Sequence, residues 1–321
     1  MGKRTIIMVA AICAVLVSVT LILIGCAQED VIIEAVNAFA GADNQAPVLI
    51  AVTSESGSVV RLDFSEPVKV YGSSFGEYTT RADGKSIYVT LPKSLPPGEQ
   101  SQVSGRVKDY AGNTCGFSVQ VWGFNPRLPA IMLNEFTTKG TAKSPDRTEL
   151  LVKTDGNIHG MTLYSGTPED WDARVIFSDL EVREGDYVVI WWTQELPDGV
   201  QEKADGVLNI CAGTSENPQS NNGTQVLCEN PSMGAAVTDC VIYSNFGESH
   251  EGYGTRAALQ RATWVFGSGG WTGDPVDSTS STATRSMSRY AEGSDSGTAD
   301  DWFVTVTGGS TFGGPNESEA F

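Results

Sequence analysis

The chain has little histidine and few basic residues. Its 321 residues include 2 His, and 21 Lys and Arg stand against 39 Asp and Glu, which gives a net charge of −18. Histidine is the usual general base near neutral pH and a frequent metal ligand, so its scarcity leaves little material for either chemistry. The excess of acidic side chains repels phosphate, which makes nucleic acid a poor partner. Solubility outside the cell is the ordinary explanation for such a charge.

Known catalytic sequence patterns are also missing. His159 and His250 lie far apart, without the H-x-x-x-H spacing of a zinc site, and neither has a Gly-x-Ser-x-Gly turn nearby. No glycine-rich loop is followed by Lys and then Ser or Thr, as a phosphate-binding loop requires. We therefore predict that the protein is not an enzyme, with no catalytic residues, no metal centre and no cofactor. Paired carboxylates of the glycosidase kind stay open, because their separation is a three-dimensional property.

Clusters of carboxylates keep a weak structural calcium site open as an alternative. Calcium is bound by several oxygen ligands and is available outside cells. The candidates are Asp109, the stretch 169–172, and Asp295 with Asp300 and Asp301. None of them follows the D-x-[DN]-x-[DN]-G pattern, so solvated acidic loops are the simpler interpretation.

The start of the chain lacks charge over a long stretch. No residue between Thr5 and Gln28 is charged, and the apolar run 6–24 is typical of an export signal, although it is also long enough for a transmembrane anchor. The run ends in Leu-Ile-Gly-Cys26, which resembles the lipobox of bacterial lipoproteins. The resemblance implies a signal peptide over residues 1–25, a lipid on Cys26 and a tether over residues 26–45. The membrane is then a partner, and the location is the bacterial outer membrane or cell surface.

Residues 46–122 alternate in the manner of β-strands. Apolar and charged side chains take turns over 60–64, which places one set on each face of a strand. No stretch has a convincing helical period, and turn signals separate the runs. The sequence Phe-Ser-Glu-Pro-Val at 64–68, followed by Asp-Tyr-Ala-Gly-Asn at 109–113, resembles the bacterial Ig-like domains of surface proteins. The resemblance implies a small Ig-like β-sandwich.

A Pro-bearing linker at 123–129 precedes a second strand-like region, residues 130–321. Short motifs in this region follow the order found in lamin-tail domains, which are Ig-like sandwiches. These motifs are Asn134-Glu135, Glu149-Leu150, Gly160 with Leu163, Gly185–Val189, Asp239–Tyr243, Ser286 with Ser288-Arg289, Asp301-Trp302 and Thr311–Asn316. Phe312 replaces the proline that is usual in the last motif, and the region is long for that family. The predicted fold class is therefore all-β, with two immunoglobulin-like β-sandwich domains after an N-terminal lipoprotein signal peptide.

Charge separates the two predicted domains. Residues 46–122 contain 7 basic and 7 acidic side chains, whereas residues 130–321 contain 11 and 28, a net charge of −17. We therefore expect interactions to fall on the second domain. Its extra length is expected in two polar loops, 194–225 and 245–284, and loops of such length are either functional or disordered.

Two cysteines flank part of the first long loop. An oxidising compartment favours a disulfide between Cys211 and Cys228, and closing a loop of this length stabilises a fold by about 3 kcal/mol in the loop-entropy model. We predict that these two residues bridge, and that Cys240, in an apolar strand, keeps a reduced thiol in the core.

The tryptophans offer a candidate ligand platform. Exposed Trp rings stack on sugars, while buried ones pack in a core with the indole N–H hydrogen-bonded. Trp191 and Trp192 are adjacent, so in a strand their side chains point to opposite faces and one of them can reach solvent. We name Trp171 and Trp192 as candidate ligand-binding residues, with core packing as the alternative.

These features together predict a non-enzymatic, lipid-anchored protein of the bacterial cell envelope. It would act in surface binding, adhesion or scaffolding, through an unidentified extracellular protein or glycan. Two alternatives stay open. Bacterial lamin-tail domains are often fused to extracellular nucleases or hydrolases, which suggests an accessory or substrate-binding component of such a system. The other alternative is a carbohydrate-binding module.

Overall fold

The structure is a computed structural model that describes residues 43–214, 218–290 and 294–316. The predicted signal peptide, the lipid acceptor Cys26 and most of the predicted tether lie outside the described residues. No described helix is both long and apolar enough to span a membrane. The described chain forms two compact units, the first with residues 43–51, 60–92 and 102–119, and the second with 52–59, 93–101 and everything from Gln120 onward.

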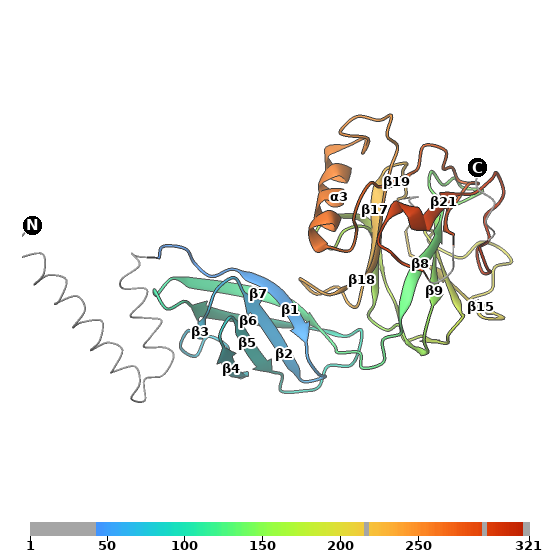
Figure 1. Ribbon diagram of the computed structural model, residues 1–321. Coiled ribbons are helices and arrows are strands. Elements are labelled where there is room, and N and C mark those ends of the chain that lie inside the picture. The colour runs from blue at the N-terminus through green and yellow to red at the C-terminus, as the bar shows by residue number, and fades with distance from the viewer. Residues whose placement is uncertain (1–42, 215–217, 291–293, 317–321) are drawn as a thin grey trace, which may run out of the picture. The chain divides into compact units, whose positions relative to one another are not determined.

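Residues 46–122, predicted from the sequence as the first domain and called so below, form strands joined by turns (Figure 1). One sheet has the order β1-β2-β5-β4 and a second has the order β3-β6-β7. The alternation expected over 60–64 is confirmed, because Val60, Leu62 and Phe64 are buried while the residues between them stay partly exposed. The strands are β1 (Leu49–Ser54), β2 (Val59–Phe64), β3 (Lys69–Val70), β4 (Thr79–Asp83), β5 (Ser86–Thr90), β6 (Gln100–Lys108) and β7 (Thr114–Trp122).

The core of the first domain lies between its two sheets. Phe117 of β7 contacts Phe64 of β2 edge to face, with ring centroids 5.7 Å apart. The turn from β6 to β7 is closed by Asp109, whose Oδ1 accepts hydrogen bonds from the backbone N–H groups of Gly112 and Asn113 at 2.6 and 2.8 Å. Gly112 has a φ of 100°, a conformation that glycine adopts without steric cost.

Residues 130–321, predicted as the second domain and called so below, are also dominated by strands. A seven-stranded sheet has the order β15-β16-β14-β9-β8-β20-β21, a five-stranded sheet has the order β12-β11-β17-β18-β19, and β10 pairs with β13. The strands are β8 (Ile131–Phe136), β9 (Arg147–Val152), β10 (Gly156–Asn157), β11 (Thr162–Gly166), β12 (Trp171–Ile176), β13 (Glu181–Val182), β14 (Tyr187–Trp191), β15 (Lys203–Ala204), β16 (Val207–Cys211), β17 (Gly223–Cys228), β18 (Val237–Ser244), β19 (Val276–Asp277), β20 (Met287–Arg289) and β21 (Trp302–Val304). The described chain is therefore all-β apart from short helical segments, as predicted.

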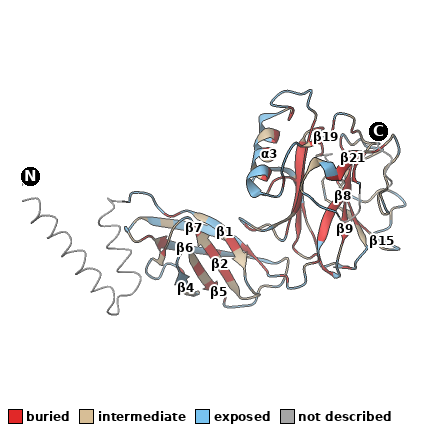
Figure 2. Cartoon of the chain, in the orientation of Figure 1, coloured by how far each residue is buried: buried red, intermediate tan, exposed pale blue. Residues whose placement is uncertain are grey.

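The two large sheets of the second domain pack through their central strands. Phe136 of β8 contacts Tyr243 of β18 with ring centroids 5.1 Å apart. The hydroxyl of Thr148 on β9 donates to Gln225 Oε1 on β17 at 2.8 Å, so polar side chains also join the sheets. Figure 2 shows these central strands coloured as buried along most of their length.

A network of buried charges ties the end of the domain to its central strands. Glu135 of β8 accepts hydrogen bonds from the Ser286 hydroxyl and from the backbone N–H of Thr311, the latter at 3.0 Å. Burial raises the pKa of the Glu135 carboxyl, against the lowering effect of these bonds. On β20, Arg289 pairs with Asp239 of β18 at 2.9 Å, and both side chains are almost fully buried. Several residues quoted from the sequence motifs therefore meet in one network.

Both predicted long loops contain regular structure, so that expectation was wrong. Loop 245–284 holds α3 (Arg256–Ser268), and loop 194–225 holds β15, β16 and the start of β17. The helix begins after Thr255, whose hydroxyl accepts from the Ala258 N–H, and ends before Gly269, which has a φ of 77°. It buries Ala258, Ala262 and Val265 on one face. This helical spacing was not recognised from the sequence, because the segment around it is rich in Ser, Thr and Gly.

Candidate functional site

The seven-stranded sheet of the second domain has an incomplete edge. β16 runs parallel to β14 from Val207 to Cys211, but β15 pairs with β16 only at Val207 and Leu208. The Asn209 N–H also donates to Glu202 O at 2.8 Å, so Ile210 and Cys211 are the residues of β16 without a strand partner on the outer side within the part of the chain that the structure describes. A hollow of about 700 Å³ opens beside this edge.

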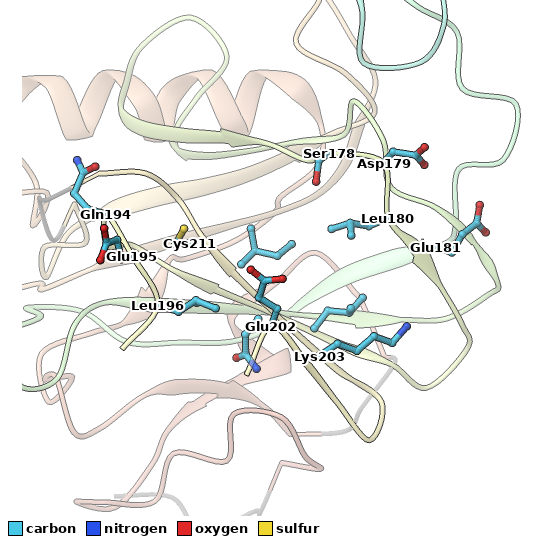
Figure 3. A pocket seen from close by; sticks show the side chains of 13 residues that line it. Ser178, Asp179, Leu180, Glu181, Gln194, Glu195, Leu196, Glu202, Lys203 and Cys211 are labelled. Carbon is cyan, nitrogen blue, oxygen red and sulfur yellow. The ribbon is translucent and has the colours of Figure 1, made fainter. Parts of the chain in front are cut away.

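The hollow, which we call the β16 hollow, has an apolar interior and an acidic rim. Figure 3 shows Leu180 and Leu196 on opposite sides, Glu202 between them, and Glu195 near Cys211 at one end. Leu208 of β16 is buried beneath them, and Ile210 is partly exposed. The lining consists of Ser178–Glu181, Gln194–Leu196, Glu202–Lys203 and Leu208–Cys211.

The carboxylates at one end of the β16 hollow already have partners. Asn157 Nδ2 donates to Asp179 at 2.7 Å and to Glu181 at 2.9 Å. Arg127 adds a bidentate ion pair to Glu181, with N–O distances of 2.8 and 2.7 Å. The hydrogen bond from Asn157, followed by the contacts of Arg127, lowers the pKa of Glu181. Both carboxylates at this end therefore have hydrogen-bond partners, and Arg127 compensates the charge of Glu181.

The remaining carboxylates are not neutralised. Among the described residues, the side chains of Glu195 and Glu202 make no hydrogen bond or ion pair, and Lys203 is the only basic residue of the lining. Unpaired carboxylates beside apolar side chains attract a ligand that is both positively charged and partly apolar. The lining holds no imidazole beside the Cys211 thiol.

The structure places the two predicted disulfide partners in different sheets. Cys211 ends β16 of the seven-stranded sheet, and Cys228 ends β17 of the five-stranded sheet. Both are free thiols, as are Cys115 and Cys240, so the bridge expected from the sequence spacing is not formed in this structure. Burial raises the pKa of Cys228 to about 12, which keeps its thiol protonated and unreactive. The spacing of two cysteines gave no information about which sheet each would join.

The two candidate tryptophans differ in exposure. Trp192 is 1% exposed and donates its indole N–H to Thr148 Oγ1 at 3.0 Å, so it is a core residue and the expected contact with a ligand was wrong. Trp171 on β12 is 39% exposed. Its ring contacts Tyr164 at 5.6 Å and lies under the Arg174 guanidinium at 4.7 Å. Only Trp171 of this pair presents an aromatic surface to solvent.

Two of the carboxylate clusters considered for calcium are held by arginine. Arg261 of α3 forms ion pairs with two carboxylates. One is Asp170, just before β12, at 2.8 Å, and the other is Asp172, within β12, at 2.5 Å. The hydrogen bond from Arg261 lowers the pKa of Asp170. Arg289 contacts Asp295 and Asp301, each at 3.4 Å. Both clusters therefore already have a cation from the chain itself.

The third calcium candidate has closer neighbours. Carboxylate oxygens of Asp43, Glu66 and Asp109 lie within 4.8 Å of one another. Burial and the charges of Asp109 and Asp43 raise the pKa of Glu66. Asp109 also accepts a hydrogen bond from Asn113 Nδ2 at 2.7 Å, besides the two that close its turn. The donor type suits calcium, but these bonds already use much of the Asp109 carboxylate, so calcium stays a prediction at this position.

Sequence reasoning missed the residues of the β16 hollow. Glu195, Glu202 and Lys203 fell within a stretch that was expected to be a loop without strands, and their spacing follows no known motif. The apolar residues Val207, Leu208 and Ile210 were the available signal for β16. The pairing of that strand with β14, which creates the edge, depends on contacts distant in sequence.

Residues 129–304, more than half of the chain, match the model of a protein family described as "protein second domain". The chain belongs to this family. The match to the second-domain family runs from the residue before Ala130 to the end of β21, so it includes the β16 hollow and α3. No curated protein matches the chain. The description states the place of a domain in a protein, and the function has to be argued from the site.

Proposed function

We propose that this protein is a non-enzymatic binding protein of the bacterial cell envelope. A lipid on Cys26 would hold it at the outer membrane or cell surface. An Ig-like domain of residues 46–122 would then carry a lamin-tail-like domain of residues 130–321. The lipobox-like end of the apolar run supports the anchor, and the meeting of Glu135, Asp239 and Arg289 in one buried network supports the lamin-tail resemblance.

The observation that carries the binding function is the β16 hollow. It combines the unpaired carboxylates of Glu195 and Glu202 with apolar side chains, at an edge where part of β16 lacks a strand partner among the described residues. We infer that the ligand is a basic segment of an extracellular protein. Its Lys or Arg side chains would pair with the carboxylates, its apolar side chains would enter the hollow, and its backbone would extend the sheet.

Peptide binding tests this function directly. The probe is a fluorescently labelled synthetic hexapeptide of alternating Lys and Leu, titrated with the full chain and followed by fluorescence anisotropy. We expect saturable binding that weakens as salt is raised from about 0.05 to 0.5 M, since salt screens exposed charges. The double variant Glu195→Gln/Glu202→Gln should bind at least about tenfold more weakly, the equivalent of about 1.4 kcal/mol.

The matched control removes the same charge elsewhere on the domain. Glu169 and Glu184 are exposed and do not line the hollow, so Glu169→Gln/Glu184→Gln removes the same two negative charges from another part of the surface. Unchanged affinity in this control separates the hollow from the general acidity of the surface. Equal weakening in both double variants would show nonspecific attraction, and the assignment of the hollow would be wrong.

Metabolic labelling tests the anchor. Cells grown with a clickable fatty acid should label the wild-type protein and leave Cys26→Ala unlabelled, and protease added to intact cells should degrade a surface-exposed protein. Label on both proteins, or on neither, would contradict a lipid on Cys26.

A further inference from the structure

One edge strand of the first domain lacks the usual protection against pairing with another chain. β7 is the outer strand of the sheet β3-β6-β7 (Figure 1), and its nine residues include no charged residue and no proline. Charged side chains, prolines and short length are the common means by which an edge strand avoids such pairing. β7 therefore has the features of a strand that is open to a partner.

The other edge strands of the described residues differ from β7. β4 and β12 carry charged side chains, and β3, β10, β13, β15, β19 and β21 have at most three residues. β1 is uncharged, but it is shorter than β7, and the Val52 N–H on it already has a backbone hydrogen-bond acceptor outside the sheet. Among these edges, β7 combines the greatest length with the absence of charge.

The outer side of β7 is open to solvent. Thr114, Gly116 and Ser118 are exposed, and among the described residues no backbone hydrogen bond joins 114–119 to a segment other than β6. Phe117 faces the core, where its ring contacts Phe64, yet it stays partly exposed. The outward N–H and C=O groups of this strand are therefore available to a second strand.

None of the contacts of the described chain requires glycine at position 116. Apart from its neighbours in the chain, the nearest atom that an added Cβ would meet is Arg106 Nε, at an ordinary contact distance of 3.8 Å. Gly116 also does not have a positive φ. Glycine inside a strand weakens it, and it is found where another backbone approaches closely. An adjoining strand would explain the glycine.

Charge favours a second copy of this chain as the partner. Each chain has a net charge of −18, so two copies repel each other where their acidic surfaces meet. Residues 46–122 contain 7 basic and 7 acidic side chains, and β7 contains none, so two copies can bring this edge together without a like-charge contact. A charged strand of another protein would find no counter-charge on β7.

The strand is also complementary to itself. In an antiparallel pair centred on Phe117, Gly116 lies opposite Ser118 and Cys115 lies opposite Val119. The small polar positions then share one face and the apolar positions share the other, as favourable cross-strand pairs require.

We propose that β7 pairs antiparallel with β7 of a second copy of this chain. The pairing joins two three-stranded sheets into one sheet of six strands, and its backbone hydrogen bonds supply the attraction. This contact lies on the first domain, so it does not depend on the ligand proposed for the β16 hollow.

Sedimentation equilibrium tests the proposal on the full chain, kept in solution by a neutral detergent. One strand pair makes a small contact, so we expect a monomer–dimer equilibrium with a dissociation constant on the order of 10 to 100 µM. Thr114→Lys and Ser118→Lys each place a charge on the paired edge, and each should raise that constant by about tenfold or more. Both variants are used because the Ser118 hydroxyl also accepts from Gln102, whereas Thr114 makes no side-chain hydrogen bond among the described residues.

The control is Ala82→Lys, which adds the same charge to the exposed edge strand β4 and should leave the equilibrium unchanged. Hydrogen exchange gives a second readout: the amides of 114–119 should exchange more slowly as the wild-type concentration rises, but not in Ser118→Lys. Circular dichroism of each variant verifies the fold.

Two outcomes would overturn the proposal. A wild-type chain that stays monomeric up to about 500 µM would show that a second copy is not the partner of β7. Dimers of both Lys variants with the wild-type dissociation constant would show that the contact between copies lies elsewhere.

Discussion

The two domains differ in how many charged side chains they bury. In the first domain, Asp109 is the only buried polar side chain among the described residues, and the ion pair of Arg81 with Asp83 is mostly exposed. In the second domain, Glu135, Asp239 and Arg289 are all buried. The first domain, with a net charge of zero, leaves nearly all of its charged side chains at least partly exposed. The second domain, with a net charge of −17, encloses several of them and must supply each with hydrogen bonds.

This contrast has a structural consequence. An apolar core such as that of the first domain tolerates some repacking, whereas a buried ionic network stabilises only when every member is satisfied. The network of the second domain joins β8, β18 and β20 to the segment around Thr311. We therefore expect the second domain to be far more sensitive to the loss of a single charge.

The largest effect is expected from Arg289→Met. The substitution leaves Asp239 buried without its cation, which should lower the free energy of unfolding of the second domain by about 3 to 5 kcal/mol. Urea denaturation followed by intrinsic fluorescence measures the loss. The double variant Arg289→Met/Asp239→Leu removes both charges and should recover much of the stability. A loss below about 1 kcal/mol in the single variant would contradict the contrast between the domains.

A pH dependence comes next in size. Burial raises the pKa of Asp146 from 3.8 to about 7, against hydrogen bonds from the Gln219 and Gly140 N–H groups. The folded state therefore binds a proton more tightly than the unfolded state does. This contribution to stability is complete below about pH 4 and is lost as the pH rises to about 7.

Denaturation at several pH values measures this dependence. We expect the wild-type second domain to lose stability between pH 4 and 7 by more than Asp146→Asn does, because the amide has no proton to lose. Identical slopes for wild type and Asp146→Asn would show that the carboxyl does not titrate in this range.

A smaller effect is expected at the start of α3. Thr255→Ala removes the hydroxyl that accepts from the Ala258 N–H at 3.1 Å, which should cost about 1 kcal/mol. Hydrogen exchange of the α3 amides measures the local loss. Thr263→Ala in the exposed middle of the same helix is the control and should cost nothing, since alanine favours a helix. Equal effects of the two substitutions would argue against a capping role.

The smallest effect is expected in the first domain. Arg81→Ala removes the ion pair with Asp83, whose side chains are 62% and 64% exposed. The free energy of unfolding should change by about 0.5 kcal/mol or less, because exposed ion pairs are screened by water and salt. A loss as large as that of Arg289→Met would remove the distinction between exposed and buried charges on which the comparison rests.

Much of the strand structure could be predicted from the sequence, because it follows from local periodicity. The alternation over 60–64 matches the burial in β2, and the strand-like region predicted over 130–321 contains fourteen strands, β8 to β21, among the described residues. The helix α3 carried readable signals, since Thr255 and Gly269 bracket apolar residues at helical spacing. Those signals were missed within a segment rich in Ser, Thr and Gly.

The candidate sites could not be predicted in the same way. The β16 hollow brings Leu180, Leu196 and Glu202 together from three segments. The register of β14 with β16 and the order of strands in each sheet determine which of these residues lie next to one another. No spacing along the chain encodes them.

The sequence by itself determined the all-β character of the described chain and the concentration of negative charge in the second domain, because period and composition are local properties. The tertiary structure decided that Trp192 is buried, that Cys211 and Cys228 join different sheets, and that Arg289 meets Asp239. Adjacent residues of a strand face opposite sides, but which side is covered depends on strands distant in sequence.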